Sequence, residues 1–305
     1  MLDICLLGTG GMMPLLYRYL TSLMVRCDGS SLLIDCGEAT QLAIKKAELP
    51  TKPIDYILFT HFHADHISGL PGLLLEMKNS DRTEPITIVG PKGVEKVVNS
   101  LRIIANELPF DINFIELNEN DGIFDLKPYR IQYFKLKHRL ECLGYNIINE
   151  RLPEFLVEKA KSNNIPIRYW NKLQHGETCY DTVNNITYTP DMVMGESRKG
   201  IKITYLTDTR PCDNIYNFAK DSDLFICEGM YGDDSKEKNA KKYLHMTMEE
   251  ACEIAVKTNP KEMWLTHYSP SEIRPKIYEE NLRKIFKNIK ICKDGEKKII
   301  NFEDE

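Results

Sequence analysis

Residues 60–66 of the chain read Thr60-His61-Phe62-His63-Ala64-Asp65-His66. Four metal-binding side chains fall within six positions, between an apolar run at residues 54–59 and a second apolar run that begins at Gly69. The first run is typical of a strand and the second of a helix. A loop that joins the end of a strand to a helix is where α/β proteins place catalytic groups. The stretch therefore predicts a metal site in an α/β protein.

Spacing divides these four side chains into two pairs. His61 and His63 are two residues apart in extended backbone, so they point the same way and can bind one ion. Asp65 and His66 follow the turn and can reach a second ion. The structural alternative is that these polar residues only cap the following helix, with Asp65 as the cap. Four such side chains are more than a cap or a solvated loop requires, which favours the metal site.

Composition narrows the class of protein. The chain has 305 residues, of which 42% are hydrophobic and 28% charged, and its formal net charge is −5. These values are ordinary for a globular protein, and the length supports one large domain or two small ones. A protein that binds nucleic acid over its whole surface is usually basic, so any contact with RNA must use local patches.

The N-terminus and the cysteines predict the compartment. Asp3 stands where a signal peptide would need a base, and no apolar run is long enough to span a bilayer. The nine cysteines occur singly, never as a Cys-x-x-Cys pair. This pattern indicates reduced thiols with structural roles and argues against a disulfide framework or a zinc ribbon. We therefore expect a cytoplasmic protein that makes no contact with a membrane.

Further metal-binding side chains follow predicted strands elsewhere in the chain. His138 comes after a strand at residues 129–136, Asp208 after a strand at residues 201–206, and His267 after a strand at residues 262–265. Any one of these alone would be read as a core, surface or turn residue. The repetition of one placement indicates that they join the His61–His66 stretch in a single site. Zinc enzymes need such imidazoles and carboxylates, with an open position for water.

These motifs together resemble the metallo-β-lactamase superfamily, and within it the ribonuclease Z branch of tRNA 3′-end endonucleases. Asp35 in segment 33–41 matches the first motif, the His-x-His-x-Asp-His run matches the second, and the three later ligands match the remaining ones. Gly8-Thr9-Gly10-Gly11 resembles the opening glycine turn of the branch, and Tyr243-Leu244-His245-Met246-Thr247 resembles its late histidine motif. The resemblance covers nearly the whole chain.

The resemblance implies the fold and its organisation. The expected fold is α/β, a four-layer αβ/βα sandwich in which residues 1–305 form a single domain. An arm insertion is expected at about residues 149–195, where prolines, charges and an apolar-aromatic run at residues 165–170 break the alternation of strands and helices. The structural alternative for this segment is a surface helix and loop without a partner.

The resemblance also implies how the site is built. It assigns three ligands to each of two zinc ions, His61, His63 and His138 to one and Asp65, His66 and His267 to the other. Asp208 would bridge the ions, and Asp35 would orient a ligand imidazole by a hydrogen bond. The alternative for Asp35 is a buried turn carboxylate that accepts hydrogen bonds from backbone amides. We expect two Zn²⁺ per chain, with Mn²⁺ or Fe as alternatives, because the sequence does not specify the metal.

The expected activity is that of a zinc-dependent phosphodiesterase, an endoribonuclease that cuts precursor tRNA at its 3′ end by attack of a metal-bridging hydroxide on phosphorus. Two dications, two ligand carboxylates and one hydroxide leave roughly one net positive charge for an anionic substrate. Asp65 fits as the base that takes the proton of the water. His245 is the candidate donor of a proton to the leaving ribose oxygen. Glu228, after a strand, is the candidate to orient His245 or raise its pKa; its alternative is a solvated strand end.

Cations gather near these motifs and predict a local phosphate-binding surface on an otherwise acidic protein. They are Lys135, Lys137, Arg139, Arg210, Lys236, Lys238, Lys241, Lys242 and Arg274. The expected partner is RNA, as precursor tRNA or another phosphodiester. A homodimer is also expected, because in the ribonuclease Z branch the arm serves the site of the neighbouring subunit.

Other functions stay open at this point. The arm segment 150–177 holds five Lys or Arg against four acids and lacks the glycine-rich tip of the branch. One alternative is therefore a hydrolase of the same fold that acts on a cyclic nucleotide or a small nucleic acid. The ligand set alone also fits a thioester hydrolase. An alternative of a different class is a non-catalytic binding protein that keeps the fold.

Overall fold

The computed structural model describes residues 1–303 and contains two seven-stranded sheets. The first has the strand order β16-β1-β2-β3-β4-β5-β6, and the second has the order β15-β14-β13-β12-β9-β8-β7. The strands of the first sheet are β1 Leu2–Gly8, β2 Ser22–Cys27, β3 Ser30–Ile34, β4 Ile54–Leu58, β5 Ile86–Pro91, β6 Ile112–Leu117 and β16 Glu296–Ile300. Those of the second are β7 Asp121–Leu126, β8 Tyr129–Lys135, β9 Leu143–Arg151, β12 Arg198–Leu206, β13 Leu224–Glu228, β14 Met263–Thr266 and β15 Ile289–Ile291.

Burial on both faces explains why the central strands read as nearly continuous apolar runs. In β1, alternate residues point to opposite faces of the sheet. All five of its apolar side chains are at most 2% exposed: Leu2, Ile4, Cys5, Leu6 and Leu7. A sheet that is buried on both faces needs a layer of structure on each side.

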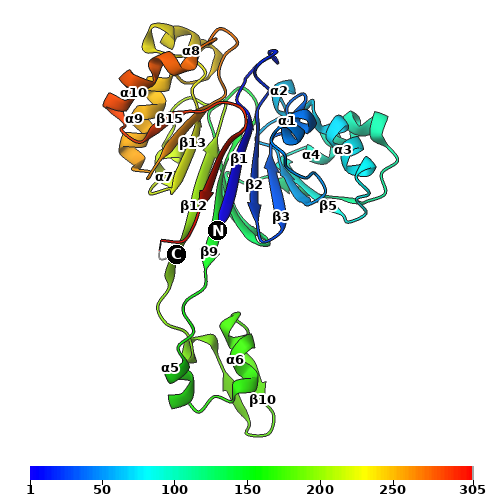
Figure 1. The fold of residues 1–305 in the computed structure, drawn as a ribbon, viewed down its shortest axis with the longest axis vertical. Coiled ribbons are helices and arrows are strands. Elements are labelled where there is room, and N and C mark those ends of the chain that lie inside the picture. Colours follow the sequence, from blue (N-terminus) through cyan, green and yellow to red (C-terminus); the bar gives the residue numbers. More distant parts are fainter. Residues whose placement is uncertain (304–305) are drawn as a thin grey trace. The chain divides into compact units, whose positions relative to one another are not determined.

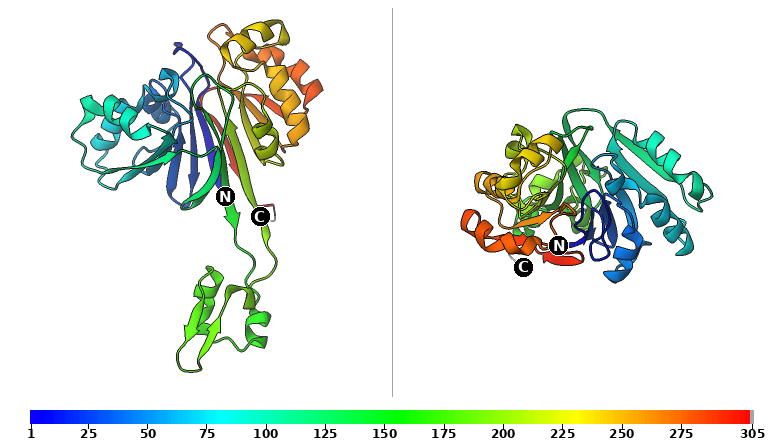
Figure 2. Two further views of the ribbon diagram at one scale, coloured as in Figure 1. Left: turned by 180° about the vertical axis from the view of Figure 1, so that it is seen from behind. Right: turned by 90° about the horizontal axis from the view of Figure 1, so that it is seen from above.

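Helices cover the outer faces of the two sheets (Figures 1 and 2). The blue-to-cyan helices on the first sheet are α1 Thr40–Lys46, α2 Ala64–Ile67, α3 Leu70–Asn79 and α4 Val94–Leu101, followed by the 3₁₀ turn η1 Arg102–Ala105. The yellow-to-orange elements on the second are α7 Asp213–Phe218, η3 Asp234–Lys236, α8 Glu237–Tyr243, α9 Met248–Thr258, η4 Pro275–Tyr278 and α10 Glu279–Ile285. Side chains of α1, α3 and α4 share one buried cluster with the first sheet, and those of α7, α9 and α10 share another with the second. The fold is thus the α/β sandwich of four layers that the sequence predicts.

Tyrosine hydroxyls join the two sheets at two places, one of them beside the His61–His66 loop. Tyr145 of β9 donates to the carbonyl of Phe59 at 2.7 Å, and Tyr129 of β8 donates to the carbonyl of Ser30 at 2.8 Å. Both rings are buried, so each hydroxyl needs a partner inside the protein. Phe59 lies directly before Thr60, so the second sheet is bonded to the backbone that leads into the loop.

Most element predictions agree with the structure to within two or three residues. A capping box begins α9, since Thr247 and Glu250 exchange hydrogen bonds. Helix α4 stops at Leu101, and a 3₁₀ turn follows it. Strands such as β7 and β16 were missed because half of their side chains are exposed and their apolar residues are sparse.

The chain divides into two compact units. Unit 1 contains Met1–Asn149 and Lys202–Asn301, and unit 2 contains Glu150–Ile201 and the C-terminal residues from Phe302. The insertion predicted at about residues 149–195 overlaps unit 2, and its boundaries stay a prediction. Within residues 1–303, no helix has the length and apolar character that crossing a membrane would need.

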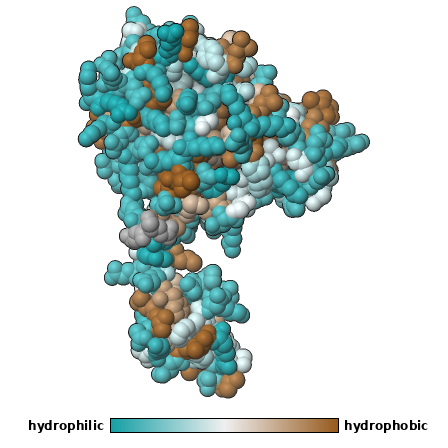
Figure 3. Space-filling view, in the orientation of Figure 1, coloured by the Kyte–Doolittle hydropathy of each residue, from teal (hydrophilic) through white to brown (hydrophobic). Residues whose placement is uncertain are grey.

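Unit 2 has a small core of its own. It contains β10 Cys179–Asp181, β11 Ile186–Tyr188, α5 Val157–Ser162, α6 Ile167–Gln174 and η2 Pro190–Met192. The apolar-aromatic run at residues 165–170 contributes to this core, where the rings of Phe155 and Trp170 lie 5.3 Å apart. Figure 3 shows hydrophobic residues scattered among polar ones on the visible surface of this unit.

The loop after β3 packs directly against the loop that carries His66. The Cys36 N–H donates to the carbonyl of His66 at 2.7 Å, and the Gly69 N–H donates to the carbonyl of Cys36 at 2.9 Å. A Cβ on Gly69 would lie 2.0 Å from the carbonyl oxygen of Gly37. Only glycine allows this approach of two backbones.

Replacing Gly69 by alanine tests this packing. Gly69→Ala must separate the two loops, and we expect the free energy of unfolding to fall by about 1–3 kcal/mol, as for other overpacked sites. Gly195→Ala is the matched control, because its Cβ would meet no atom closer than 3.4 Å. Urea denaturation measures both, and equal stability of the two variants would contradict the account.

Candidate active site

The structure brings the predicted site residues together at the ends of strands. Asp35 follows β3, the His61–His66 loop follows β4, and His138, Asp208 and His267 follow β8, β12 and β14. Glu228 is the last residue of β13, and His245 lies between α8 and α9. Parallel strands end at one edge of a sheet, so side chains that are distant in sequence meet there.

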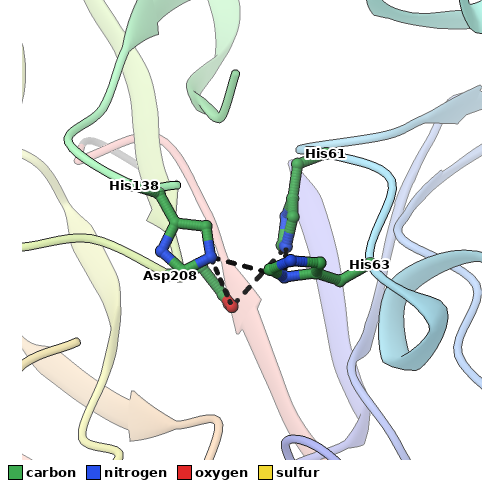
Figure 4. Close-up of side chains that lie close together, drawn as sticks. All are labelled: His61, His63, His138 and Asp208. Carbon is green, nitrogen blue, oxygen red and sulfur yellow. Dashed lines mark hydrogen bonds and ion pairs between the residues drawn. The ribbon is translucent and has the colours of Figure 1, made fainter. Parts of the chain in front are cut away.

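The first group of donor atoms comes from three imidazoles and one carboxylate. Nε2 of His61 lies 2.8 Å from Nδ1 of His63, and Nε2 of His138 lies 3.3 Å from the same nitrogen. In Figure 4 these rings and the Asp208 carboxylate point toward one another from different loops. All four donor atoms lie within 4.8 Å of one another, a spacing that suits a single cation.

The second group contains Asp65, His66 and His267. Nε2 of His66 lies 3.2 Å from Nε2 of His267, and Oδ2 of Asp65 lies 3.4 Å from Nε2 of His267. The two imidazoles are fully buried, and Asp65 is 8% exposed. These three donor atoms also lie within 4.8 Å of one another.

Asp208 stands between the two groups and offers one oxygen to each. Oδ2 lies 3.6 Å from Nε2 of His61 and 3.7 Å from Nε2 of His138. Oδ1 lies 3.1 Å from Nε2 of both His66 and His267. The carboxylate is thus placed as a shared ligand would be. Its backbone has a φ of 52°, a left-handed conformation that Asp tolerates better than most residues.

The outer nitrogens of two imidazoles are fixed by hydrogen bonds. Nδ1 of His66 lies 2.8 Å from Oδ2 of Asp35, and Nδ1 of His138 lies 3.1 Å from the carbonyl of Leu244. Because both acceptors require a donor, Nδ1 carries a hydrogen in each ring, and Nε2 is the nitrogen that faces Asp208 and is placed to bind a cation. Asp35 also accepts the backbone N–H of Thr60 at 2.9 Å, so it combines both of the contacts considered for it from the sequence.

The pKa shifts of His61, Asp65 and Asp208 suit cation binding, whereas the charges of Asp208 and Asp35 raise the pKa of His66 against its burial. Burial and the neighbouring charge of His66 lower the pKa of His61 well below its ordinary value. Burial would raise the pKa of Asp208, but the charges of His267 and His66 outweigh it and hold that pKa well below its usual range. Burial would also raise the pKa of Asp65, but the charge of His66 and the hydrogen bond of His267 outweigh burial and lower that pKa. The carboxylates are therefore ionised and His61 is neutral at physiological pH.

The residues present fit a metal. Imidazole nitrogens of different residues face one another at 2.8 and 3.2 Å, and Oδ1 of Asp208 lies 3.1 Å from Nε2 of both His66 and His267. Nitrogen and carboxylate oxygen donors suit Zn, Mn and Fe, and a deprotonated carboxylate beside neutral imidazoles is the state that such ions bind. The centre can bind metal, and its donor chemistry admits these three elements.

His245 and Glu228 form a pair beside this centre. Glu228 is fully buried, so it is not a solvated strand end, and its Oε2 lies 3.1 Å from Nδ1 of His245. The other carboxylate oxygen accepts the N–H of Thr209 at 2.5 Å. Nε2 of His245 lies 3.9 Å from Oδ2 of Asp208. Burial lowers the pKa of His245, but the charge and hydrogen bond of Glu228 outweigh it and raise the pKa to about 9.

A cavity of about 330 Å³ opens onto the centre. Its lining combines ligand candidates, a cation and apolar or aromatic side chains: Met12, His63, Asp65, His138, Arg139, Asp208, Met230, Tyr231, Tyr243, His245 and Ser269. A polar centre with an aromatic wall suits a ligand that has both an anionic group and a flat ring.

Several predicted phosphate-binding cations are paired with acids. Lys135, Lys236 and Lys241 form ion pairs with glutamates, and Arg210 forms an ion pair with Glu250 that is only slightly exposed. Arg139 lines the cavity. The predicted basic surface is therefore smaller than the sequence indicates, because acids four to forty residues away lie beside these cations in the fold.

Three contacts of the centre were missed in the sequence. The N–H of Met12 donates to Oδ2 of Asp65 at 2.6 Å, and a Cβ on Gly11 would lie 2.6 Å from the imidazole of His267. The Thr60 hydroxyl lies 2.9 Å from Asp35. The glycine turn at residues 8–11 was the available signal for the first two, and the position of Thr60 directly before His61 was the signal for the third.

Known proteins resemble this chain over its full length. A ribonuclease Z from Lachnospira eligens is 55% identical and one from Agathobacter rectalis is 52% identical, each over 305 residues that cover 100% of both chains. A ribonuclease Z from Clostridium acetobutylicum is 48% identical over 310 residues, again covering 100% of both. Residues 2–150 match the family described as Anti-Pycsar protein Apyc1, and residues 180–268 match the beta-lactamase superfamily domain.

Solved structures agree on the fold. Human tRNase Z, short form, superposes with a TM-score of 0.71 at 24% identity, covering 98% of this chain and 100% of that one. The metallo-beta-lactamase fold protein YhfI from Bacillus subtilis gives a TM-score of 0.68 at 18% identity, covering 97% and 98%. The fold is the metallo-β-lactamase fold, and with full-length relatives at about half identity, the chain belongs to the ribonuclease Z family.

Proposed function

We propose that this protein is a zinc-dependent endoribonuclease that cuts precursor tRNA at its 3′ end. The observation that carries the proposal is Asp208, whose two carboxylate oxygens face two separate groups of imidazole and carboxylate donors. Shared ligands of this kind are typical of two-metal enzymes, a class that includes nucleases and phosphatases. The name of the full-length relatives, ribonuclease Z, supports RNA as the substrate.

Two zinc ions would be held by the seven predicted ligands, with Asp208 common to both. When bound, they would activate a water and stabilise the charge that develops on phosphorus oxygens. Asp65 would accept a proton from the attacking water. Its Oδ2 is anchored by the Met12 N–H at 2.6 Å, which fixes the carboxylate against the cavity.

His245 would give its proton to the ribose oxygen that leaves phosphorus. The ring lines the cavity, and Glu228 holds its Nδ1 at 3.1 Å, so Nε2 is the atom free to donate. The buried carboxylate keeps the imidazole charged until that proton is transferred. After the proton leaves Nε2, the neutral ring no longer offers Glu228 an opposite charge, which favours return of a proton after product release.

The wider setting of the enzyme follows from its family. We propose that it is a cytoplasmic homodimer and that unit 2 is the arm that contacts tRNA. Nine free cysteines support a reducing compartment. The few cations on unit 2 support only weak electrostatic binding of RNA phosphates, so recognition of the shape of the RNA must contribute to binding.

Cleavage of tRNA is the direct test. The zinc-loaded protein is expected to trim a precursor tRNA that carries a 3′ trailer, and to lose this activity in the presence of a chelator until zinc is added back. Gel mapping of the products locates the cut. Hydrolysis of a cyclic nucleotide or of bis(p-nitrophenyl) phosphate without any cut in the tRNA would contradict the proposal and favour the alternative phosphodiesterase.

The role of His245 predicts a separation of turnover from metal binding. His245→Ala should lower kcat on precursor tRNA by about 10²–10⁴-fold, the usual contribution of a general acid, and leave KM and the zinc content close to those of the native protein. Single-turnover kinetics measure the rate of cleavage, and atomic absorption measures the zinc content. If zinc is lost with the activity, His245 is a ligand and the proposed proton transfer is wrong.

A further inference from the structure

Arg210 follows Asp208 by two residues, yet its side chain does not face the solvent. The side chain is 12% exposed and forms an ion pair with Glu250, whose side chain is 14% exposed. Nη1 lies 2.7 Å from Oε2, and Nη2 contacts Oε1, so the pair is bidentate. A planar guanidinium bound in this way fixes its own orientation and that of the carboxylate.

The same guanidinium reaches the loop that carries His245. Nη1 of Arg210 donates to the carbonyl of His245 at 2.7 Å. Glu250 accepts the N–H of Thr247 at 3.0 Å and completes the capping box at the start of α9. The ion pair therefore holds the His245 backbone from two positions, at the residue itself and two residues beyond it.

The backbone of Arg210 is bonded to a third loop. Its N–H donates to the carbonyl of Lys137 at 3.0 Å, and the N–H of Lys137 donates to Oγ1 of Thr209 at 3.0 Å. Lys137 lies directly before His138. Arg210 is thus in contact with the loops of Asp208, His138 and His245 at once.

We propose that Arg210, with Glu250, is a positioning residue that sets the place of the His245 imidazole relative to the metal centre. The proposal rests on the proposed function, because it takes His245 as the proton donor. In that reaction the bond from the water oxygen to phosphorus forms and the bond from phosphorus to the ribose oxygen breaks. The ribose oxygen takes the proton of His245, and Asp65 takes the proton of the water.

A comparison of two leaving groups tests the proposal. A ribose alkoxide needs the proton, whereas p-nitrophenolate leaves as a stable anion. Arg210→Lys keeps the charge but cannot form both contacts. We expect kcat on precursor tRNA to fall at least about tenfold more than kcat on bis(p-nitrophenyl) phosphate, with little change in KM, because small displacements of a catalytic group cost up to about 100-fold. The ratio of kcat on precursor tRNA to kcat on bis(p-nitrophenyl) phosphate should therefore fall in Arg210→Lys, and it should fall in His245→Ala as well.

Two further variants separate positioning from folding. Arg283→Lys is the matched control, since Arg283 pairs with Glu279 on α10 and is 54% exposed; its ratio should equal that of the native protein. The double variant Arg210→Met with Glu250→Gln removes both charges, and the new amide oxygen can still accept the N–H of Thr247. Zinc content and the thermal midpoint are measured for each.

The outcomes are distinct. A larger loss on tRNA in both Arg210→Lys and the double variant, with zinc retained, supports the proposal. Equal losses on the two substrates, or no loss, overturn it and leave Arg210 a structural residue. Failure of the native protein to cut tRNA contradicts the proposed function instead, and the same ratio measured with a dinucleoside phosphate then still tests Arg210.

Discussion

The shared carboxylate of Asp208 is the constraint on which the centre depends. Its two oxygens face different groups of donors, with nitrogen to oxygen distances of 3.1 Å on one side and 3.6–3.7 Å on the other. A buried carboxylate surrounded by imidazoles loses much hydration, and only opposite charge or direct coordination compensates for that loss. The surrounding loops therefore have to present their donors to one point, and the sandwich of two sheets supplies the rigid base from which they do so.

Backbone conformation at the strand ends makes this convergence possible. Asp35, Asp208 and His267 each follow a strand and each has a positive φ, between 52° and 60°. Such conformations cost about 1–3 kcal/mol for residues other than glycine and persist where the surroundings determine them. Here the turn aims each side chain across the edge of the sheets. Two glycines also hold the site together, because Gly11 allows close packing against the imidazole of His267 and Gly69 allows close approach to the backbone of Gly37, where a Cβ would clash.

The sequence predicts the ligands better than their supports. His61, His63, Asp65 and His66 are recognisable because their density exceeds what a loop or a cap needs, and the later ligands because each follows an apolar strand. The pairing of Glu228 with His245 was foreseen from the position of Glu228 at the end of an apolar strand, where it is the last residue of β13. The buried pair of Arg210 with Glu250 was not, since forty residues separate the two and nothing local in the sequence connects them. Edge strands such as β7 were also missed. Every second residue of β7 is exposed, and a short strand with few apolar residues gives a weak signal in the sequence.

Anomalous scattering at the zinc edge from crystals of the zinc-loaded protein tests the central claim most directly. The account predicts two peaks, one among His61, His63 and His138 and one among Asp65, His66 and His267, with one Asp208 oxygen bound to each. A single peak, or two peaks of which neither contacts Asp208, would contradict it.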